Sequence, residues 1–554
     1  MSSPTMPNKP LSHTLTACAC LLALHHASAT AQATTAAAST PPTAERPAAS
    51  RASIQGFEVQ GNTLLPRELI EQRLIDFKGE ADLKRMRDAA AALQDLYRKG
   101  GYGGVIAFLP EQTLDQGVLR IRVVEGRLER IEVTAGQYFD RDNLLASLPT
   151  LQVGQTPQVR LIDAQIQMAN ENPAKNVQVL LQPGSEPGRI VAKVSIKEQT
   201  VQRWYARADN TGSERTGRWR AAAGWQHANL WGQDHVLNTE LQTAPEHPSQ
   251  VLVFSGNYRV PLYGRAMSID AYGAWSNVDG GKSGTAAGDL EFSGKGHVLG
   301  LRVSKYLQRI GNVDQRLHIG LEHRDYLNSC RIEGLPAGAC GSAGASIRLQ
   351  PVTLNYTVQT EGVYRTGLSL GWSHNFGWGG NHASKADFEA LRRSAKPRYD
   401  LFKVNANASL PLGSLGRLQV RLAGQHTTQP LVAGEAFGLG GAMSVRGFEE
   451  RELVGDIGMQ GSIEFWGNNL AEPLGLSQAA LVPLLFADAG YVSNVDGAPC
   501  QPGQTTCRMG SIGAGLRVEW QGAQLRLDWA VPANSTTSTH RGNSRLHLGL
   551  SYNF

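Results

Sequence analysis

The sequence predicts an all-β transmembrane barrel of about sixteen antiparallel strands, preceded by two small α+β periplasmic domains. Three observations support this fold class: a secretory signal at the N-terminus, an arrangement of strands and helices that occurs twice, and a long C-terminal series of short segments with alternating polarity. We therefore divide the chain into a signal peptide (1–33), a flexible leader (34–52), a first domain (53–126), a second domain (127–198) and a barrel (199–554).

The composition excludes a helical membrane protein and argues against a nucleic-acid-binding protein. Apolar residues make up 41% of the chain, and after the first few dozen residues no stretch approaches the roughly 18 apolar residues of a membrane-spanning helix. The 61 glycines suit an all-β region with many turns. The net charge is only +5 and the basic residues are scattered, so we expect no nucleic-acid partner.

The N-terminus has the features of a secretory signal peptide. Lys9 precedes the apolar stretch Leu15 to Leu24, and Ala29-Thr30-Ala31 and Ala31-Gln32-Ala33 offer small-residue cleavage sites. The leader that follows is rich in Ala, Thr, Pro and Ser and has no potential core. The sequence therefore predicts a protein that leaves the cytoplasm.

Four cysteines remain after removal of the signal peptide, and they form two close pairs, Cys330 with Cys340 and Cys500 with Cys507. This spacing favours local disulfides in an oxidising compartment. Zinc ligation is the alternative, but neither pair has CxxC spacing or suitably placed histidines. We expect each pair to close a short extracellular segment.

The repeated unit has the order strand, helix, helix, strand, strand and a length of about 70 residues. In its first copy a helix from about Leu83 to Lys99 places apolar residues on one face and ends at Gly100-Gly101. The two copies join directly at Val123 to Leu128. We expect the edges of their sheets to be the strands Val105 to Leu109 and Val177 to Leu181.

The C-terminal segments are each about ten residues long and are separated by Gly, Asn, Asp and Pro. The candidates are 201–209, 218–230, 235–243, 250–260, 266–276, 297–308, 315–327, 347–359, 363–376, 400–410, 417–427, 457–467, 481–492, 511–521, 524–531 and 545–554. Alternation alone would also suit a soluble sandwich. The signal peptide, the even number of strands and the aromatic C-terminal residue Phe554 favour a closed barrel in the outer membrane.

Sequence patterns for catalysis are weak. Gly281-Lys282-Ser283 resembles the end of a phosphate-binding loop but lacks the earlier glycine, so we expect an ordinary loop there. No GxSxG or HExxH pattern occurs, and the histidines are scattered. We therefore expect no enzyme activity, no catalytic residues, no cofactor and no metal site.

Three motifs near the C-terminus are more specific. Val445-Arg446-Gly447-Phe448 lies in a glycine-rich connection, 428–456, that is too long for a simple turn. Gly461-Ser462-Ile463-Glu464 is on the next strand, and Phe486-Ala487-Asp488-Ala489-Gly490 is on the one after. Phe486, Asp488 and Gly490 share one face, and the carboxylate predicts that this face lines the lumen.

These motifs, the barrel ending in Phe554 and the two preceding repeats resemble the superfamily of outer-membrane assembly and translocation barrels with polypeptide-transport-associated domains. Two such domains are similar to those of two-partner secretion translocators, the haemolysin-secretion and filamentous-haemagglutinin exporters. The resemblance implies that the loop folds back into the barrel, that Arg446 contacts Asp488, and that Phe554 is a C-terminal assembly signal. It implies as partners a large unfolded exoprotein, outer-membrane lipid and the barrel assembly machinery.

Two other functions remain open from the sequence. An insertase of the same superfamily would place other barrels in the membrane, but two repeats instead of five count against it. A passive porin would not need the repeats or the 428–456 loop. Some relatives carry an N-terminal helix in the pore, whereas Pro41, Pro42 and Pro47 interrupt any helix in the leader.

Overall fold

The structure of the chain is a computed structural model, and it describes residues 52–554 except for 215, 278–280, 286–287, 293–294, 328–345 and 477. The predicted signal peptide, the leader and the Cys330–Cys340 pair lie outside the described residues.

The first N-terminal domain contains the predicted order strand, helix, helix, strand, strand, with two additional short strands, β1 (Ala52–Ile54) and β3 (Gly79–Ala81), that pair with each other. Its other elements are β2 (Gly56–Gln60), α1 (Arg67–Leu74), the 3-10 helix η1 (Ile75–Phe77), α2 (Leu83–Lys99), β4 (Val105–Phe108), η2 (Asp115–Gly117) and β5 (Val118–Glu125). Asp82 caps α2 by accepting a hydrogen bond from the Arg85 N–H at 2.8 Å. The apolar face of α2 buries Leu93 and Tyr97 against Ile121 of the sheet.

The second domain repeats this arrangement with β6 (Arg127–Thr134), α3 (Arg141–Ala146), α4 (Val159–Ala169), β7 (Lys175–Pro183) and β8 (Arg189–Glu198). The strand order is β2-β5-β4 in the first sheet and β6-β8-β7 in the second. The predicted edge positions of β4 and β7 are therefore confirmed.

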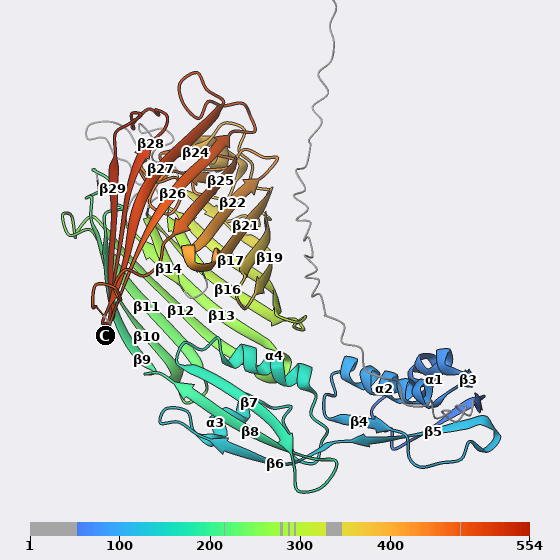
Figure 1. Cartoon of the computed structure of the whole chain (residues 1–554). Helices are drawn as coiled ribbons and strands as arrows, with labels where there is room; N and C mark the ends of the chain where they lie inside the picture. The colour runs from blue at the N-terminus through green and yellow to red at the C-terminus, as the bar shows by residue number, and fades with distance from the viewer. Residues whose placement is uncertain are drawn as a thin grey trace, which may run out of the picture. The chain divides into compact units, whose positions relative to one another are not determined.

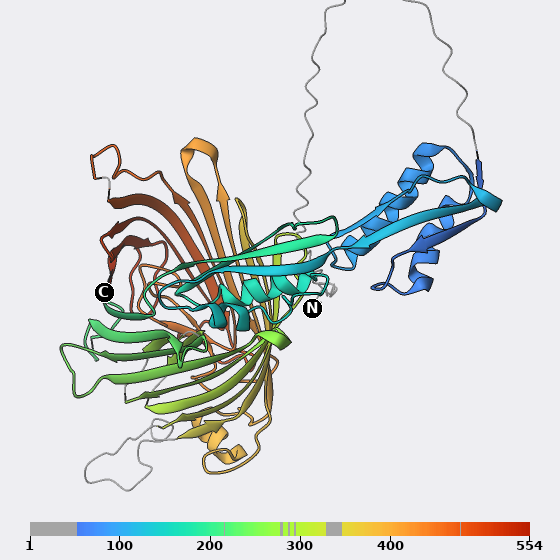
Figure 2. The same ribbon diagram turned by 90° about the horizontal axis from the view of Figure 1, so that it is seen from below.

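The remaining chain forms a closed antiparallel barrel (Figure 1; Figure 2). Its strands are β9 (Gln202–Asp209), β10 (Arg220–Leu230), β11 (His235–Thr243), β12 (Leu252–Leu262), β13 (Met267–Ser276), β16 (Gly296–Tyr306), β17 (Val313–Tyr326), β18 (Ile347–Leu349), β19 (Pro351–Thr360), β20 (Arg365–Asn375), β21 (Tyr399–Pro411), β22 (Arg417–His426), β25 (Ile457–Trp466), β26 (Ala479–Ser493), β27 (Thr506–Trp520), β28 (Ala523–Pro532) and β29 (Arg545–Asn553). Both β18 and β19 pair with β17, so they are one interrupted strand. This confirms the predicted barrel of sixteen strands.

The last strand closes the barrel against the first. Residues Gly549 to Asn553 of β29 pair with Asp209 to Tyr205 of β9. The backbone N–H of Phe554 donates to the carbonyl of Trp204 at 2.9 Å, and its ring lies 4.8 Å from that of Tyr552. Closure of this seam leaves no open sheet edge, as a strand structure in lipid requires.

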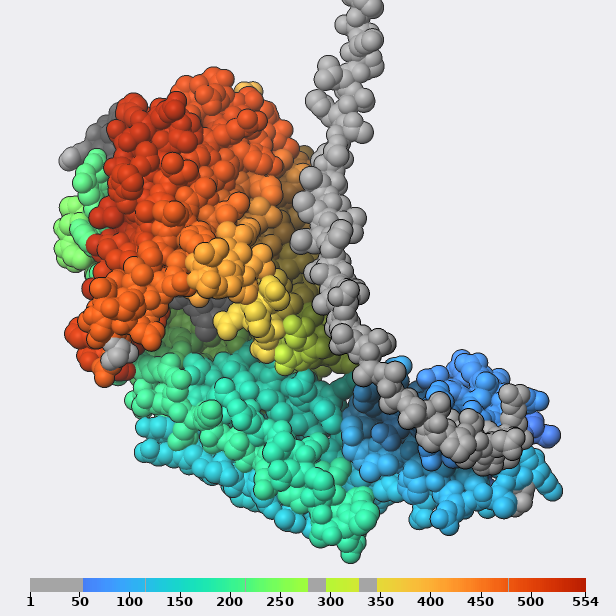
Figure 3. Space-filling model, viewed as in Figure 1, coloured from blue at the N-terminus to red at the C-terminus, as the bar shows by residue number. Residues whose placement is uncertain are grey.

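Side chains alternate between the two faces of the barrel wall. On β28, Trp529 is 52% exposed and points outward, whereas its neighbour Asp528 is fully buried on the inner face. In the space-filling view, the C-terminal part of the barrel, coloured orange to red, forms a continuous surface (Figure 3). Apolar side chains can therefore meet lipid while charged ones meet each other inside.

Three short elements in the connections between barrel strands differ from the prediction or were not predicted. Gly281-Lys282-Ser283 was expected to be a loop, but it lies in β14 (Gly281–Thr285), which pairs with β15 (Gly288–Phe292). The expectation was wrong because cross-strand backbone pairing leaves little trace in so short a glycine-rich sequence. The helix α5 (Lys385–Leu391) and the hairpin β23 (Phe437–Leu439) with β24 (Leu453–Gly455) lie in long connections between barrel strands. Among the described residues, no helix is long and apolar enough to span a membrane.

Candidate functional site: a loop held against the inner wall of the barrel

The connection between β22 and β25, residues 427–456 in the structure, folds inside the barrel. Its β24 contacts β26, and its Val445 and Phe448 are fully buried. These two side chains pack with Leu439 of the same connection and with Val492 and Met509 of the wall. The outward neighbours on the same strands, such as Leu485 and Ile512, are exposed, so the loop lies on the lumenal face.

Arg446 is the central contact of this loop. Its Nε donates to Asp488 Oδ2 at 2.7 Å and its Nη2 to Asp488 Oδ1 at 2.8 Å. The backbone N–H of Arg446 also donates to Asp488 Oδ2, at 3.1 Å. A planar guanidinium can grip both oxygens of a carboxylate in this way, and an ammonium group cannot.

Other side chains of the wall complete the pocket of Arg446. Its Nη2 lies 2.8 Å from Glu464 Oε1 and donates to Ser462 Oγ at 3.1 Å. The guanidinium carbon lies 3.4 Å from the ring centroid of Phe486, which adds a cation–π contact. The motifs at 445–448, 461–464 and 486–490 therefore meet at one place.

The same pocket includes residues that the sequence did not single out. Arg446 Nη1 lies 3.6 Å from Asp528 Oδ1, and Asp528 also pairs with Arg517 at 2.8 Å and Arg526 at 2.6 Å. The N–H of Gly447 donates to His547 Nε2 at 2.9 Å. The sequence pattern that placed Asp488 in the lumen also applies to Asp528, because Asp528 is a carboxylate on the inner face of an alternating strand.

Two glycines make room for the loop. Gly447 has φ +94°, a backbone conformation that other residues rarely adopt. At Gly490 a Cβ would lie 2.4 Å from Leu439 Cδ1 and 2.8 Å from the carbonyl oxygen of Met459. The wall can therefore approach the loop closely only where it carries no side chain.

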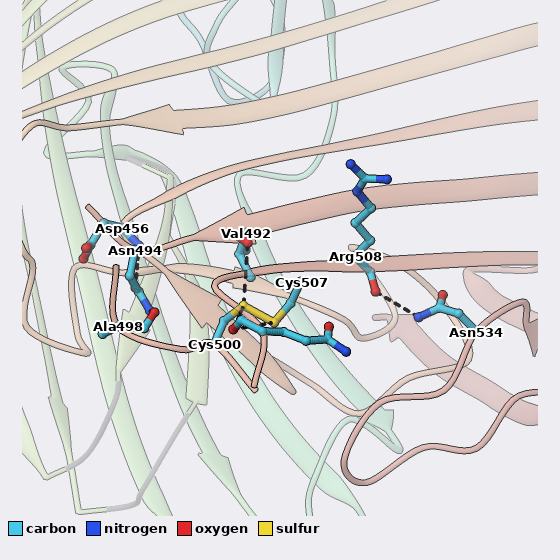
Figure 4. Close-up of a disulfide and its surroundings, with 9 residues drawn as sticks. Asp456, Val492, Asn494, Ala498, Cys500, Cys507, Arg508 and Asn534 are labelled. Carbon is cyan, nitrogen blue, oxygen red and sulfur yellow. Dashed lines mark hydrogen bonds between the residues drawn. A yellow bond between two sulfur atoms is a disulfide. The ribbon is translucent and has the colours of Figure 1, made fainter. Parts of the chain in front are cut away.

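A disulfide joins Cys500 to Cys507 beside this loop (Figure 4). The pair lies between the outer ends of β26 and β27, and Cys507 belongs to the same apolar cluster as Val445 and Phe448. Asn534 of the next connection donates to the carbonyl of Arg508 at 2.9 Å.

A second arginine joins three connections at the outer end of the barrel. Arg392 donates to both oxygens of the buried Asp456, at 2.5 and 2.8 Å, and to Asp496 at 2.8 Å. Its neighbour helix α5 packs Phe388 against Tyr399 and Leu431. Ion pairs therefore link the three connections that contain Arg392, Asp456 and Asp496.

The first N-terminal domain carries a groove between α2 and its edge strand β4. The groove has a volume of about 580 Å³ and is lined by Ala90, Gln94, Val105, Ala107 and Phe108 among others. Gln94 Oε1 accepts a hydrogen bond from the Ala107 N–H at 3.1 Å. A backbone donor at the sheet edge is thus satisfied by a side chain.

The second N-terminal domain contacts the barrel through a buried ion pair. Lys175 Nζ lies 2.6 Å from Asp234 Oδ2 in the turn between β10 and β11, and Tyr263 donates to the same oxygen at 2.6 Å. Burial lowers the pKa of Lys175, although the attraction of Asp234 opposes this shift. Glu171 lies 3.0 Å from Arg259 and 2.7 Å from Arg316 of the barrel.

A closed sixteen-stranded barrel, a lumenal loop held by an arginine and two N-terminal α+β domains together define an outer-membrane translocation barrel. The model of the haemolysin secretion/activation protein family ShlB/FhaC/HecB matches residues 190–518, and that of the ShlB-type POTRA domain matches residues 52–126. The first match covers more than half of the chain, so the protein belongs to the ShlB/FhaC/HecB family.

Individual relatives agree with this assignment. The chain is 24% identical to the outer membrane transporter CdiB of Dickeya dadantii over 81% of its own length and 77% of the relative's. It is also 24% identical to the haem/hemopexin transporter protein HuxB of Haemophilus influenzae, over 80% and 76%. The structure of CdiB from Escherichia coli superposes with a TM-score of 0.75 at 19% identity and covers 93% of each chain.

A further solved structure shares the fold at a lower level of similarity. BamA from Haemophilus ducreyi, lacking POTRA domains 1–3, has a TM-score of 0.50 at 14% identity over 91% of this chain and 100% of that chain. The protein is an outer-membrane transporter of the two-partner secretion kind, with its N-terminal domains in the periplasm.

Proposed function

We propose that the protein receives its unfolded exoprotein partner at the edge strands β4 and β7 and passes it through the barrel when the 427–456 loop is released from the inner wall. The observation that carries this proposal is the Arg446–Asp488 pair, which fixes the loop inside the lumen. The exoprotein must pass through the part of the lumen that this loop occupies.

Capture at a sheet edge suits an unfolded partner. An extended peptide can add a strand to an exposed edge through backbone hydrogen bonds, which are independent of sequence. The groove beside β4 gives side chains of the incoming strand a place to bind. β4 exposes Ile106 and Phe108 as well, so the edge offers apolar contacts.

The energy for export comes from folding of the exoprotein outside the cell. No nucleotide-binding motif is present in the sequence, so export is not expected to use nucleotide hydrolysis by this chain. The protein acts as a transporter without catalytic residues or a cofactor. Its further partners are outer-membrane lipid and the barrel assembly machinery, which recognises the C-terminal strand ending in Phe554, and it binds no nucleic acid.

Deletion of the N-terminal domains tests the division of labour. The variant lacking residues 53–197 keeps every barrel strand, so we expect it to reach the outer membrane with normal heat-modifiable mobility but to export none of its exoprotein partner. Secretion by this variant at a level near that of the intact protein would contradict capture by the N-terminal domains.

A further inference from the structure

Two histidines and an aspartate come together on the outward face of the barrel, near the outer ends of β16 and β17. Asp325 is the cross-strand partner of His297, and His323 lies two residues before Asp325 on the same strand. By the two-residue period all three side chains share one face. We propose that His297, His323 and Asp325 bind a divalent transition-metal ion of the zinc class.

The distances between the potential ligand atoms fit such an ion. His297 Nε2 lies 3.1 Å and His323 Nε2 3.4 Å from Asp325 Oδ2, and all three ligand atoms lie within 4.8 Å of one another. Two ligands bound at about 2.0–2.1 Å to a tetrahedral zinc ion are about 3.4 Å apart. The side chains therefore need only small rotations to bind one ion.

The two imidazole rings are stacked. Their planes differ by 20° and their centroids are 6.0 Å apart, and the Nε2 atom of each ring faces the same carboxylate oxygen, Asp325 Oδ2. The side chains of His297 and His323 are 37% and 35% exposed, whereas that of Asp325 is 5% exposed. The fourth position of the ion is thus open to water, as in zinc sites with three protein ligands.

Arg348 orients the carboxylate of this site. Its Nε donates to Asp325 Oδ1 at 2.7 Å and its Nη2 to Oδ2 at 3.0 Å. Ligating carboxylates are commonly held by a hydrogen bond to their second oxygen. The ion uses Oδ2, and Arg348 Nε keeps Oδ1.

The donor set defines the class of metal. Two imidazoles and one carboxylate suit zinc and its first-row neighbours, whereas magnesium and calcium require a shell of oxygen ligands. The bound ion would join β16 to β17 at their outer ends. The sequence predicted no metal site because 26 residues separate the two histidines, and only the strand register brings them together.

Metal binding by the untagged, full-length protein in detergent tests the proposal. After treatment with a chelator, equilibrium dialysis against Zn²⁺ is expected to load one ion per chain, and Co²⁺ is expected to give the intense visible absorption of a four-coordinate site. His297→Ala, His323→Ala and Asp325→Asn are each expected to weaken binding at least tenfold.

His374→Ala is the matched control. His374 is an outward-facing histidine near the outer end of β20 that pairs with Asp400 at 2.9 Å, but among the described residues it belongs to no group of three potential metal ligands. This variant is expected to bind Zn²⁺ and Co²⁺ like the unchanged protein. Heat-modifiable mobility verifies that each variant has folded. Binding that survives in the folded double variant H297A/H323A, or that is absent from the unchanged protein, would overturn the proposal.

Discussion

Arg446 and Asp488 are 42 residues apart in the chain, and they form an ion pair with two side-chain hydrogen bonds in which neither side chain is accessible to solvent. Arg446 comes from a connection between strands and Asp488 from the barrel wall. The pair therefore joins the lumenal loop to the structure that surrounds it.

Arg446→Ala and Asp488→Ala are both expected to reduce secretion strongly and to leave the amount of barrel in the outer membrane unchanged. Loss of one partner leaves the other buried without its counter-charge, at a cost of about 3–5 kcal/mol for a fully desolvated pair. Because both changes break the same contact, the double variant is expected to secrete about as much as either single variant. Secretion of the exoprotein and heat-modifiable mobility are the measurements.

Arg545→Ala provides the control for this prediction. Arg545 pairs with Glu449 of the same loop at 3.0 Å, but their side chains are 36% and 45% exposed. Exposed ion pairs contribute about 0–1 kcal/mol, so secretion is expected to stay near normal. If the effects of Arg446→Ala and Asp488→Ala added, or if both variants secreted normally, the pair would not hold the loop.

Gly490→Ala is expected to displace the loop without changing any charge. The added methyl group would overlap Leu439 and the backbone carbonyl of Met459, and the backbone cannot move without distorting the barrel wall. Limited proteolysis of intact cells would show new cleavage within 427–456. Gly461→Ala is the control, because its Cβ would come no closer than 3.7 Å to the nearest atom, Arg421 O. Equal protection of the loop in both variants would argue against close packing at Gly490.

Much of the barrel could be predicted from the sequence because each strand carries its own signal. Lipid on one side and a polar lumen on the other impose a two-residue alternation, as in Trp529 and Asp528. The helix α5 had a weaker signal, the capping box formed by Ser384 and Asp387, and at seven residues it was too short to show a helical period.

The candidate site was predictable only in part. The position of Asp488 on the inner face followed from alternation, whereas its contact with Arg446 followed from family resemblance. His547 could not be predicted in this way, because it contacts Gly447 across 100 residues of chain and its strand meets the loop only after the barrel has closed. Distances between residues that are remote in sequence depend on strand register, which no local pattern specifies.

Replacement of Cys500 and Cys507 is expected to destabilise the outer ends of β26 and β27. Closing a loop of about eight residues contributes roughly 2.5 kcal/mol in the chain-entropy model. Cys500→Ser with Cys507→Ser is therefore expected to lower the temperature at which the barrel loses its heat-modifiable mobility, while secretion persists. Mass spectrometry of non-reduced peptides from the unchanged protein checks the pairing and extends to Cys330 with Cys340. A Cys340–Cys500 linkage would contradict both local pairs.

Gln94→Ala is expected to strengthen binding of the exoprotein. In the free protein the Gln94 side chain accepts the hydrogen bond of the Ala107 N–H at the edge of β4, and a strand added to this edge must replace it. Removal of the side chain leaves that donor to water, so binding no longer breaks an internal hydrogen bond worth about 0.5–1.5 kcal/mol. The dissociation constant of the full-length protein in detergent for an N-terminal exoprotein fragment is expected to fall by about two- to tenfold. Gln60→Ala is the control, because Gln60 lies on β2, away from β4, and among the described residues its side chain bonds to the exposed Glu58 alone. Weaker binding by Gln94→Ala than by Gln60→Ala would show that the exoprotein uses the Gln94 side chain directly and not the backbone edge that it covers.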